Sequence, residues 1–334
     1  MTQAKRLSDG PWRRMGWACI LASGTIQWGT KTMMRRVCLA FGIALAIGAG
    51  PAGAQELTGT LKKIKETGTI TLGYRESSVP FSYLDDNQKP IGYALEICQE
   101  IVGAVKKELK LDKLEVKMVP VTSSNRIPLM ANGTTDMECG STTNNAERQK
   151  QVSFTNSHYL TASKMVSKVS SNIHKIDDLK GKTVVSTAGT TNILQVNEVN
   201  TARNLGLTIV PAKDHAEAFL MVETGRAVAF VMDDIIIAGL VANAKNPKDY
   251  TISDDAFSRP EPYGIMIPKD DAAFKKIADA TTAALFTSPR GPALFDKWFD
   301  QAIPPKGINL NVPLAGVLKR AMEKPSDSPD PAAY

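Results

Sequence analysis

The chain has 334 residues, of which 43% are hydrophobic, 22% charged and 6% aromatic, and this composition excludes a disordered, collagen-like or coiled-coil protein. At roughly 100 to 200 residues per domain, the length predicts about two globular domains. The formal net charge of +6 lies wholly in residues 1–54, which carry seven basic residues and one acidic residue, so the rest of the chain is neutral and nucleic acid is not expected as a partner.

The N-terminal segment has the pattern of a secretory leader. A basic stretch at 31–36 precedes the apolar run Val37–Ile47, and small residues follow at 52–54, as in a signal peptide. The apolar run reaches only about half of the roughly 20 residues that span a bilayer, which disfavours a membrane anchor. Residues 1–32 lack the pattern and are interpreted as a start-site artefact. We expect a mature protein from Gln55, without a lipid anchor, in the periplasm of a Gram-negative bacterium.

Strands and helices alternate in the first part of the exported chain. Residues 69–78 predict a strand and a polar loop, and residues 92–110 predict a helix. A strand at 114–120, a short helix within 123–133 and a strand at 135–141 are expected next. The helix prediction rests on apolar residues at helical spacing, namely Leu95, Ile97, Ile101, Val102, Val105 and Leu109.

The same order of elements is repeated further along the chain. The pattern predicts, in order, a strand with a polar loop, a helix, a strand, a helix and a strand at 182–192, 193–206, 207–212, 214–225 and 227–234. At a shift of 91 residues, Val119-Pro120 falls on Val210-Pro211. Two more helices are expected at 272–286 and 294–299, before a tail rich in Pro, Ser and Asp.

This alternation predicts an α/β fold with two similar lobes, each a mixed, mostly parallel sheet flanked by helices. About 280 mature residues exceed what one core comfortably supports. Because the C-terminal helices have no third lobe to join, we assign them to the first. Lobe 1 is then discontinuous, residues 55–160 plus 262–334, and lobe 2 is residues 161–261.

The cysteines and histidines bear on redox state and metal binding. Cys98 and Cys139 are the only cysteines after the leader, and in an oxidising compartment they suggest one disulfide, with two buried free thiols as the alternative. The histidines, His158, His174 and His215, are scattered and none has a ligand spacing from a cysteine. Neither a metal nor another cofactor is expected.

Polar residues collect in the loops that follow the predicted strands. Ligands of open α/β sheets bind beyond the carboxyl ends of strands, so these loops should face a shared cleft. They contain Arg75, Ser77, Thr122, Ser123, Asn125, Arg126, Ser141, Thr142, Thr143, Arg148, Gly189, Thr190, Thr191, His215, Asp233 and Asp234. Arginine binds carboxylates through a planar fork, and three arginines exceed what one carboxylate needs. A ligand with two anionic groups is implied, with Asp233 able to meet an ammonium.

Each of these residues also has a simpler interpretation. A loop arginine is usually a solvated surface charge, and Thr190 or His215 could serve only at a helix N-terminus. Asp233 or Asp234 could merely begin the next helix. Spacing alone leaves the site undecided.

Longer stretches of sequence resemble a known family. The chain is similar to the periplasmic glutamate/aspartate-binding proteins of ATP-binding-cassette importers, within the polar amino-acid solute-binding family. The resemblance spans about 61–323 and is carried by RESSVPFSY, TSSNRIPLMANGTTDMECGSTTNNAERQKQVSF, STAGTT, AKDHAEAF, GRAVAFVMDD and WFDQAIPPKGINLN. It implies a two-lobed periplasmic binding protein of type II that closes about a hinge.

The resemblance also implies roles for ten residues. The ligand's α-carboxylate is expected at Arg148, with Ser141, Thr143, Thr190 and Thr191 as helpers, and its α-ammonium at Asp233. The side-chain carboxylate is expected at Arg75, Ser123, Arg126 and His215.

Three classes of function are consistent with these observations. The first is a monomeric receptor that delivers L-glutamate or L-aspartate to the membrane permease of an ABC importer. The second is an enzyme, because cyclohexadienyl dehydratases resemble this fold and an acid in the cleft could act as a general acid. The third is a signalling ectodomain, although no membrane-spanning segment follows the tail. The receptor is the main prediction, and the sequence does not rank glutamate against aspartate.

Overall fold

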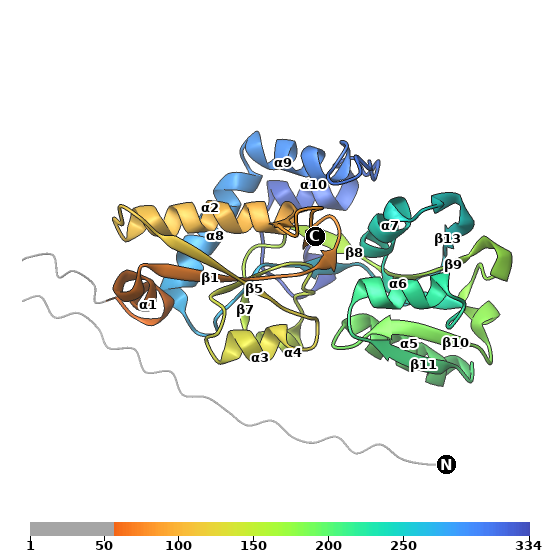
Figure 1. The fold of residues 1–334 in the computed structure, drawn as a ribbon. Helices are drawn as coiled ribbons and strands as arrows, with labels where there is room; N and C mark the ends of the chain where they lie inside the picture. Colours follow the sequence, from red (N-terminus) through yellow and green to blue (C-terminus); the bar gives the residue numbers. More distant parts are fainter. Residues whose placement is uncertain (1–56) are drawn as a thin grey trace, which may run out of the picture. The chain divides into compact units, whose positions relative to one another are not determined.

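The computed structural model describes residues 57–334. The signal peptide, the cleavage site and the start-site artefact predicted for residues 1–54 lie outside the described residues. The described part forms one compact unit built around two five-stranded sheets (Figure 1).

The first sheet has the strand order β5-β1-β6-β15-β7. Its strands are β1 (Thr69–Tyr74), β5 (Glu115–Pro120), β6 (Met137–Cys139), β7 (Ser153–Phe154) and β15 (Met266–Ile267). The pairs β1–β5 and β1–β6 are parallel, whereas β15 is antiparallel to both β6 and β7. Four of the five strands therefore run in one direction.

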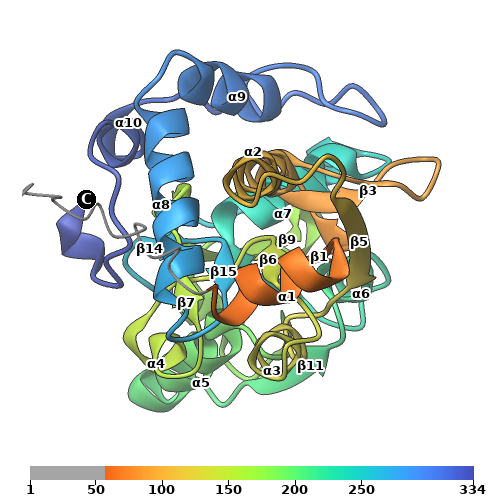
Figure 2. The same cartoon turned by 90° about the vertical axis from the view of Figure 1, so that its left-hand side faces the viewer.

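Helices from the first and the last part of the described chain pack around this sheet. They are α1 (Gly59–Thr67), α2 (Tyr93–Glu108), α3 (Arg126–Ala131), α4 (Ala146–Gln149), α8 (Ala272–Phe286), α9 (Arg290–Phe299) and α10 (Gly316–Glu323). Helix α8 packs against α1 and α2, and α9 and α10 pack against α8 (Figure 2). The C-terminal helices therefore pack with the first sheet, although they follow the strands of the second sheet in the sequence.

The second sheet repeats the arrangement in the order β11-β10-β12-β9-β13. Its strands are β9 (Ser163–Lys168), β10 (Thr183–Thr187), β11 (Thr208–Ala212), β12 (Ala229–Asp233) and β13 (Tyr250–Ile252), and its helices are α5 (Thr191–Arg203), α6 (His215–Glu223) and α7 (Asp234–Asn243). Again three parallel strands adjoin one reversed strand, here β9. The duplicated, two-lobed α/β fold is confirmed.

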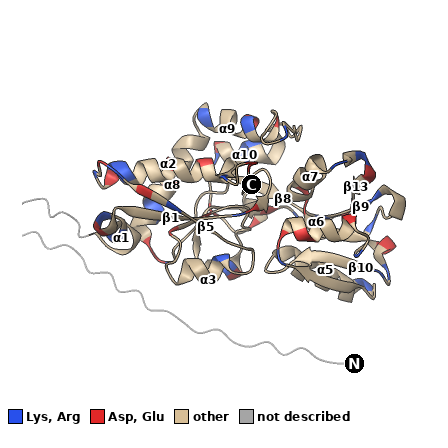
Figure 3. Ribbon diagram, viewed as in Figure 1, with Lys and Arg blue, Asp and Glu red and all other residues tan. Residues whose placement is uncertain are grey.

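Two antiparallel strands, β8 (Tyr159–Thr161) and β14 (Glu261–Tyr263), lie where the chain passes between the sheets. A small sheet of β2 (Ser77–Ser78), β3 (Ser82–Leu84) and β4 (Pro90–Ile91) adjoins the first. The β8–β14 pair fits a two-stranded connection, while the exact lobe limits of 160 and 262 stay a prediction. Acidic and basic residues are interspersed over both sheets' helices (Figure 3).

Local sequence explains where several helices begin and end. The six apolar residues that predicted α2 are all buried. Helix α5 begins at Thr191, two residues before the predicted start, because Thr190 Oγ1 accepts a hydrogen bond from the Ile193 N–H (3.3 Å). Helix α9 also begins earlier than predicted, at Arg290. The short helices α1 and α10 were not predicted.

Cys98 on α2 and Cys139 on β6 form a disulfide, with their Cα atoms 6.2 Å apart. Both residues are buried. The disulfide prediction is confirmed, and the alternative of two free thiols is not.

Candidate functional site

The ten predicted site residues all lie at the carboxyl ends of strands or on the helices that follow them, and all are buried. Parallel strands that point the same way bring these ends to one edge of each sheet. Eight of the ten line one small, tightly closed cavity, together with Asn192 and Met232. The eight are Ser123, Arg126, Ser141, Thr143, Thr190, Thr191, His215 and Asp233.

Arg75 does not line the cavity itself, but its guanidinium contacts two residues that do. Its Nη2 donates to Ser123 Oγ (2.7 Å) and lies 3.4 Å from His215 Nε2. The His215 Nδ1 is 2.8 Å from Thr187 Oγ1. Burial, and then the cations Arg75 and Arg126, hold the pKa of His215 well below its usual range, so the ring is neutral. Side chains from both sheets therefore converge on one end of the cavity.

Arg148 belongs to a second hydrogen-bonded group beside the cavity, although it is not one of the residues that line it. Its Nη1 donates to the Thr143 carbonyl (2.8 Å) and its Nη2 to the Gly189 carbonyl (3.3 Å). Thr143 Oγ1 is 3.5 Å from Thr191 Oγ1. Since Gly189 lies in the loop after β10 and Thr191 begins α5, both in the second lobe, this group also joins the two lobes.

Arg126 lies between these two groups. Its Nη1 donates to the Ser141 carbonyl (3.3 Å), and its positive charge lowers the pKa of both Arg75 and Arg148. Burial is the larger cause for each, and their pKa values fall to about 10 and about 9. All three arginines stay charged at neutral pH, so the cavity is strongly cationic.

Several buried polar atoms here have no hydrogen-bond partner among the described residues. They include Nη1 of Arg75, Nε of Arg126, Oγ of Ser141 and Oδ1 of Asn192. Buried polar groups are almost always paired, so these atoms indicate a polar ligand or waters.

Asp233 provides the negative charge on the second lobe. Its Oδ1 accepts from Asn192 Nδ2 (2.8 Å) and its Oδ2 accepts from the Tyr263 hydroxyl. Burial raises the pKa of Asp233 to about 7, although both hydrogen bonds oppose the shift. A cationic group placed beside this carboxylate would favour its ionised form.

Residues 70–301 match the family described as bacterial extracellular solute-binding proteins, family 3. This chain belongs to that family.

Curated relatives of this family-3 protein are similar over nearly their whole length. The L-glutamate/L-aspartate-binding protein of Pseudomonas aeruginosa is 50% identical over 290 residues, which cover 86% of this chain and 96% of that one. The glutamate/aspartate import solute-binding protein of Escherichia coli is 45% identical over 296 residues, covering 89% and 96%.

Solved structures share the fold at lower identity. A mutant of ArgBP from T. maritima has a TM-score of 0.63 and 28% identity, covering 71% of this chain and 98% of its own. The ancestral amino acid-binding protein AncCDT-1, described as a precursor of cyclohexadienyl dehydratase, has a TM-score of 0.62 and 26% identity, covering 72% of this chain and 100% of its own.

The family-3 protein also has site residues that sequence reasoning missed. Tyr263 and Asn192 hold Asp233, and Glu138 on β6 is fully buried with one oxygen accepting from Thr142 Oγ1 (2.6 Å). The charge of Glu138 opposes the lowering of the pKa of all three arginines. Its position within the strand, where a side chain is normally apolar, was the available signal.

Other predicted loop residues serve local structure instead. Thr122 and Asn125 bond each other's backbone N–H groups, and Asp234 accepts from Thr161 Oγ1 (2.6 Å) at the start of α7. Ser77 lies on β2 and is not part of the cavity lining.

Two negative findings apply to residues 57–334. They contain no group of three or more His, Cys, Asp or Glu side chains able to hold a metal ion. No helix among them has the length and apolar character to cross a bilayer.

Proposed function

We propose that this family-3 protein is a periplasmic receptor that captures L-glutamate or L-aspartate between its lobes and delivers it to the membrane permease of an ABC importer. The observation that carries the proposal is the cavity between the lobes, which Arg126 and Asp233 line and beside which Arg75 and Arg148 are buried. The names of the two curated relatives described above support the same ligands.

The charges of the cavity fit a ligand with two carboxylates and one ammonium. The three arginines carry three positive charges, and the acids whose charges act on them or on Asp233 include Glu138 and Glu261. Two ligand carboxylates would compensate arginines of the two hydrogen-bonded groups, and a ligand ammonium would compensate Asp233. Buried charges are tolerated only when they are compensated, so a neutral amino acid is a poorer match.

Two subsites follow from the two hydrogen-bonded groups. We assign the α-carboxylate to Arg148, helped by Ser141, Thr143, Thr190 and Thr191, and the α-ammonium to Asp233. The side-chain carboxylate falls to Arg75, Ser123, Arg126 and His215. The neutral His215 ring fits a supporting role: with Nδ1 protonated and donating to Thr187 Oγ1, its Nε2 can accept from Arg75 and orient that guanidinium. Arg126, which lies between the groups, can contact either carboxylate.

We further propose that the protein acts as a monomer and without enzymatic turnover. The curated relatives described above are named as binding proteins. Prephenate turnover, measured beside glutamate binding, separates the receptor from a dehydratase: product formation would contradict the proposal.

Isothermal titration with alanine variants of the three arginines tests the two subsites. Arg148→Ala should abolish binding of every α-amino acid, because that fork holds the group they share. Arg75→Ala and Arg126→Ala should weaken glutamate by about 1.5 to 3 kcal/mol, the contribution of a charged hydrogen bond, and affect glutamine much less. The exposed Arg226 provides the matched control, and Arg226→Ala should bind like wild type.

The ratio of glutamate to glutamine affinity is the decisive quantity. This ratio should fall in Arg75→Ala and Arg126→Ala, because glutamate binding weakens much more than glutamine binding. If Arg148→Ala retains glutamate binding, or if both other variants keep the wild-type ratio, the subsite assignment is wrong.

A further inference from the structure

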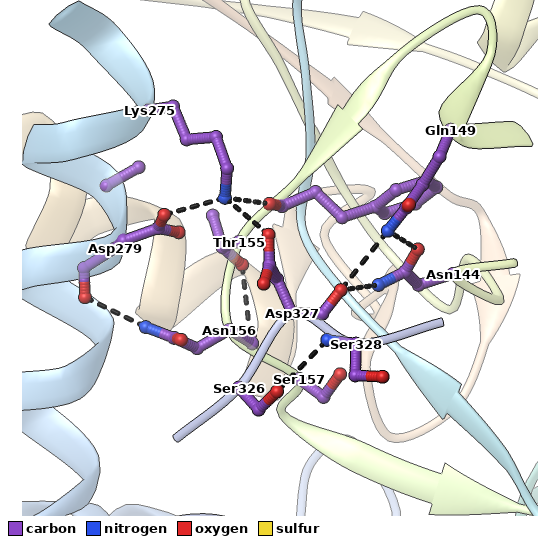
Figure 4. A network of polar contacts seen from close by, with 12 residues as sticks. Asn144, Gln149, Thr155, Asn156, Ser157, Lys275, Asp279, Ser326, Asp327 and Ser328 are labelled. Carbon is purple, nitrogen blue, oxygen red and sulfur yellow. Dashed lines mark hydrogen bonds and ion pairs between the residues drawn. The ribbon is translucent and has the colours of Figure 1, made fainter. Parts of the chain in front are cut away.

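A C-terminal segment crosses the loop that presents the α-carboxylate subsite. We define residues 325–334 as the C-terminal strap. The backbone carbonyl of Asp327 accepts hydrogen bonds from Asn144 Nδ2 (2.9 Å) and Gln149 Nε2 (3.1 Å) (Figure 4). The Gln149 amide also donates to Asn144 Oδ1 (2.9 Å). One strap oxygen therefore accepts hydrogen bonds from a residue just before α4 and from the last residue of α4.

Helix α4 needs external support because it is only four residues long. A single isolated turn is unstable, since the cost of fixing its backbone is not repaid by one or two internal hydrogen bonds. Its N-terminus is capped by Asn145 Oδ1, which accepts from the Arg148 N–H (2.9 Å). The strap adds bonds at Asn144 and Gln149, the residues that bracket the turn carrying Arg148.

The strap is itself fixed to a firm part of the first lobe. Asp327 Oδ2 pairs with Lys275 Nζ (2.8 Å), and Lys275 also bonds Asp279 on α8 (2.6 Å) and the Phe154 carbonyl (2.9 Å). Figure 4 shows Lys275 bonded to Asp279 of α8 and to Asp327 of the strap, and its bond to Phe154 joins both to β7.

A second attachment lies next to the connection between the lobes. The Ser157 N–H donates to the Ser326 carbonyl (2.7 Å), and Ser157 Oγ is 2.7 Å from the Tyr334 hydroxyl. That hydroxyl also donates to the carbonyls of Ser326 and Ser328 (3.0 and 2.9 Å). Ser157 lies two residues before β8, so the strap joins the Arg148 loop to the start of the connection.

We infer that the C-terminal strap is a positioning element for ligand binding: it holds α4 so that the Arg148 guanidinium keeps its place between the Thr143 and Gly189 carbonyls, at the proposed α-carboxylate subsite. The inference rests on the proposed function, in which Arg148 binds the α-carboxylate. Because every α-amino acid shares that carboxylate, loosening the strap weakens all ligands by the same factor and leaves the ratio of glutamate to glutamine affinity unchanged.

The double variant Asn144→Ala/Gln149→Ala tests this inference without altering a proposed ligand contact. Three neutral hydrogen bonds are lost, the two to the Asp327 carbonyl and the one between the two side chains, and we expect the Kd for glutamate, aspartate and glutamine to rise roughly fivefold or more. Titrations are made well below each variant's Tm. Gln301→Ala, which removes a side-chain amide bond to Asp296 at the end of α9, is the matched control and should leave Kd unchanged.

Hydrogen exchange distinguishes positioning from general stabilisation. In the ligand-bound double variant, the Arg148 amide should exchange faster while the amides of β1 stay protected. A purely structural role would lower Tm but leave both Kd and this local exchange as in the wild type. Where the double variant fails to fold, Tyr334→Phe loosens the strap from Ser157, and its Kd should rise for all three ligands by a smaller common factor.

The outcomes separate the two proposals. The strap inference is overturned if the folded variants keep the wild-type Kd, or if their ratio of glutamate to glutamine affinity changes. The proposed function is unaffected by either result as long as the wild-type protein binds glutamate or aspartate. Failure of the wild-type protein to bind any of the three ligands overturns the proposed function instead.

Discussion

Gly189 allows the two lobes to approach each other, and replacing it by alanine should impair closure without removing any ligand contact. A Cβ at this position would lie 2.6 Å from the Cα of Ser124 and 2.7 Å from the carbonyl oxygen of Ser123. Ordinary contact begins near 3.4 Å, so the lobes would have to separate by about 0.8 Å. The obstructing atoms are backbone, which no rotamer change can move aside.

The affinity loss follows from the contact that this separation disturbs. Arg148 Nη2 reaches the Gly189 carbonyl at 3.3 Å, and a further 0.8 Å breaks that charged hydrogen bond. Such bonds contribute about 1.5 to 3 kcal/mol, which corresponds to roughly a tenfold to hundredfold rise in the Kd for glutamate. Isothermal titration measures the Kd, and small-angle scattering should show less compaction on adding glutamate than in the wild type.

Gly225 provides a matched control for the backbone cost. Its φ of +73° is close to the +78° of Gly189, but a Cβ there meets nothing within 4 Å. Both Gly189→Ala and Gly225→Ala should lose about 1 to 2 kcal/mol of stability from the left-handed conformation. Only Gly189→Ala should lose affinity. Wild-type glutamate affinity in Gly189→Ala would show that this approach of the lobes is absent from the ligand-bound state.

Three further predictions concern the disulfide and the buried acids. Replacing Cys98 and Cys139 by serine removes a disulfide between residues 41 positions apart and should lower the free energy of unfolding by about 4 kcal/mol in the loop-entropy model. Urea denaturation measures this loss, and a loss below about 1 kcal/mol would contradict the prediction. Because burial raises the pKa of Asp233 from 3.8 to about 7, its contribution to the stability of the ligand-free protein is present at low pH and is lost as the pH rises from about 4 to 7. Asp233→Asn should therefore reduce the change in the free energy of unfolding, measured by urea denaturation, between pH 4 and 7. An unchanged dependence on pH would refute the shift. Glu138→Gln leaves the buried arginines undercompensated and should cost about 3 to 5 kcal/mol of ligand-free stability. Saturating glutamate should then raise its Tm more than it raises that of the wild type, and an equal rise would exclude this charge-balancing role.

The order of the elements and the end of each strand could be read from local sequence. Apolar residues at a spacing of two or of three to four mark one face of a strand or helix, which is why α2 and α8 were predicted close to their observed bounds. Short elements such as α4 and α10 were missed because they contain too few residues for a periodic pattern. Their conformation depends on partners distant in sequence.

The sequence by itself determined the duplicated α/β pattern, the neutral net charge of residues 55–334, and a set of cations, hydroxyls and acids at strand ends. Only the tertiary structure decided how these side chains lie around the cavity: Arg126 lies between the two hydrogen-bonded groups, and Tyr263 holds Asp233 from β14. It likewise decided that the Asp327 carbonyl supports the Arg148 turn, across 178 residues of sequence from Gln149. The physical reason is that periodicity records which face of an element is buried, whereas hydrogen bonds and charge compensation depend on which elements meet after folding.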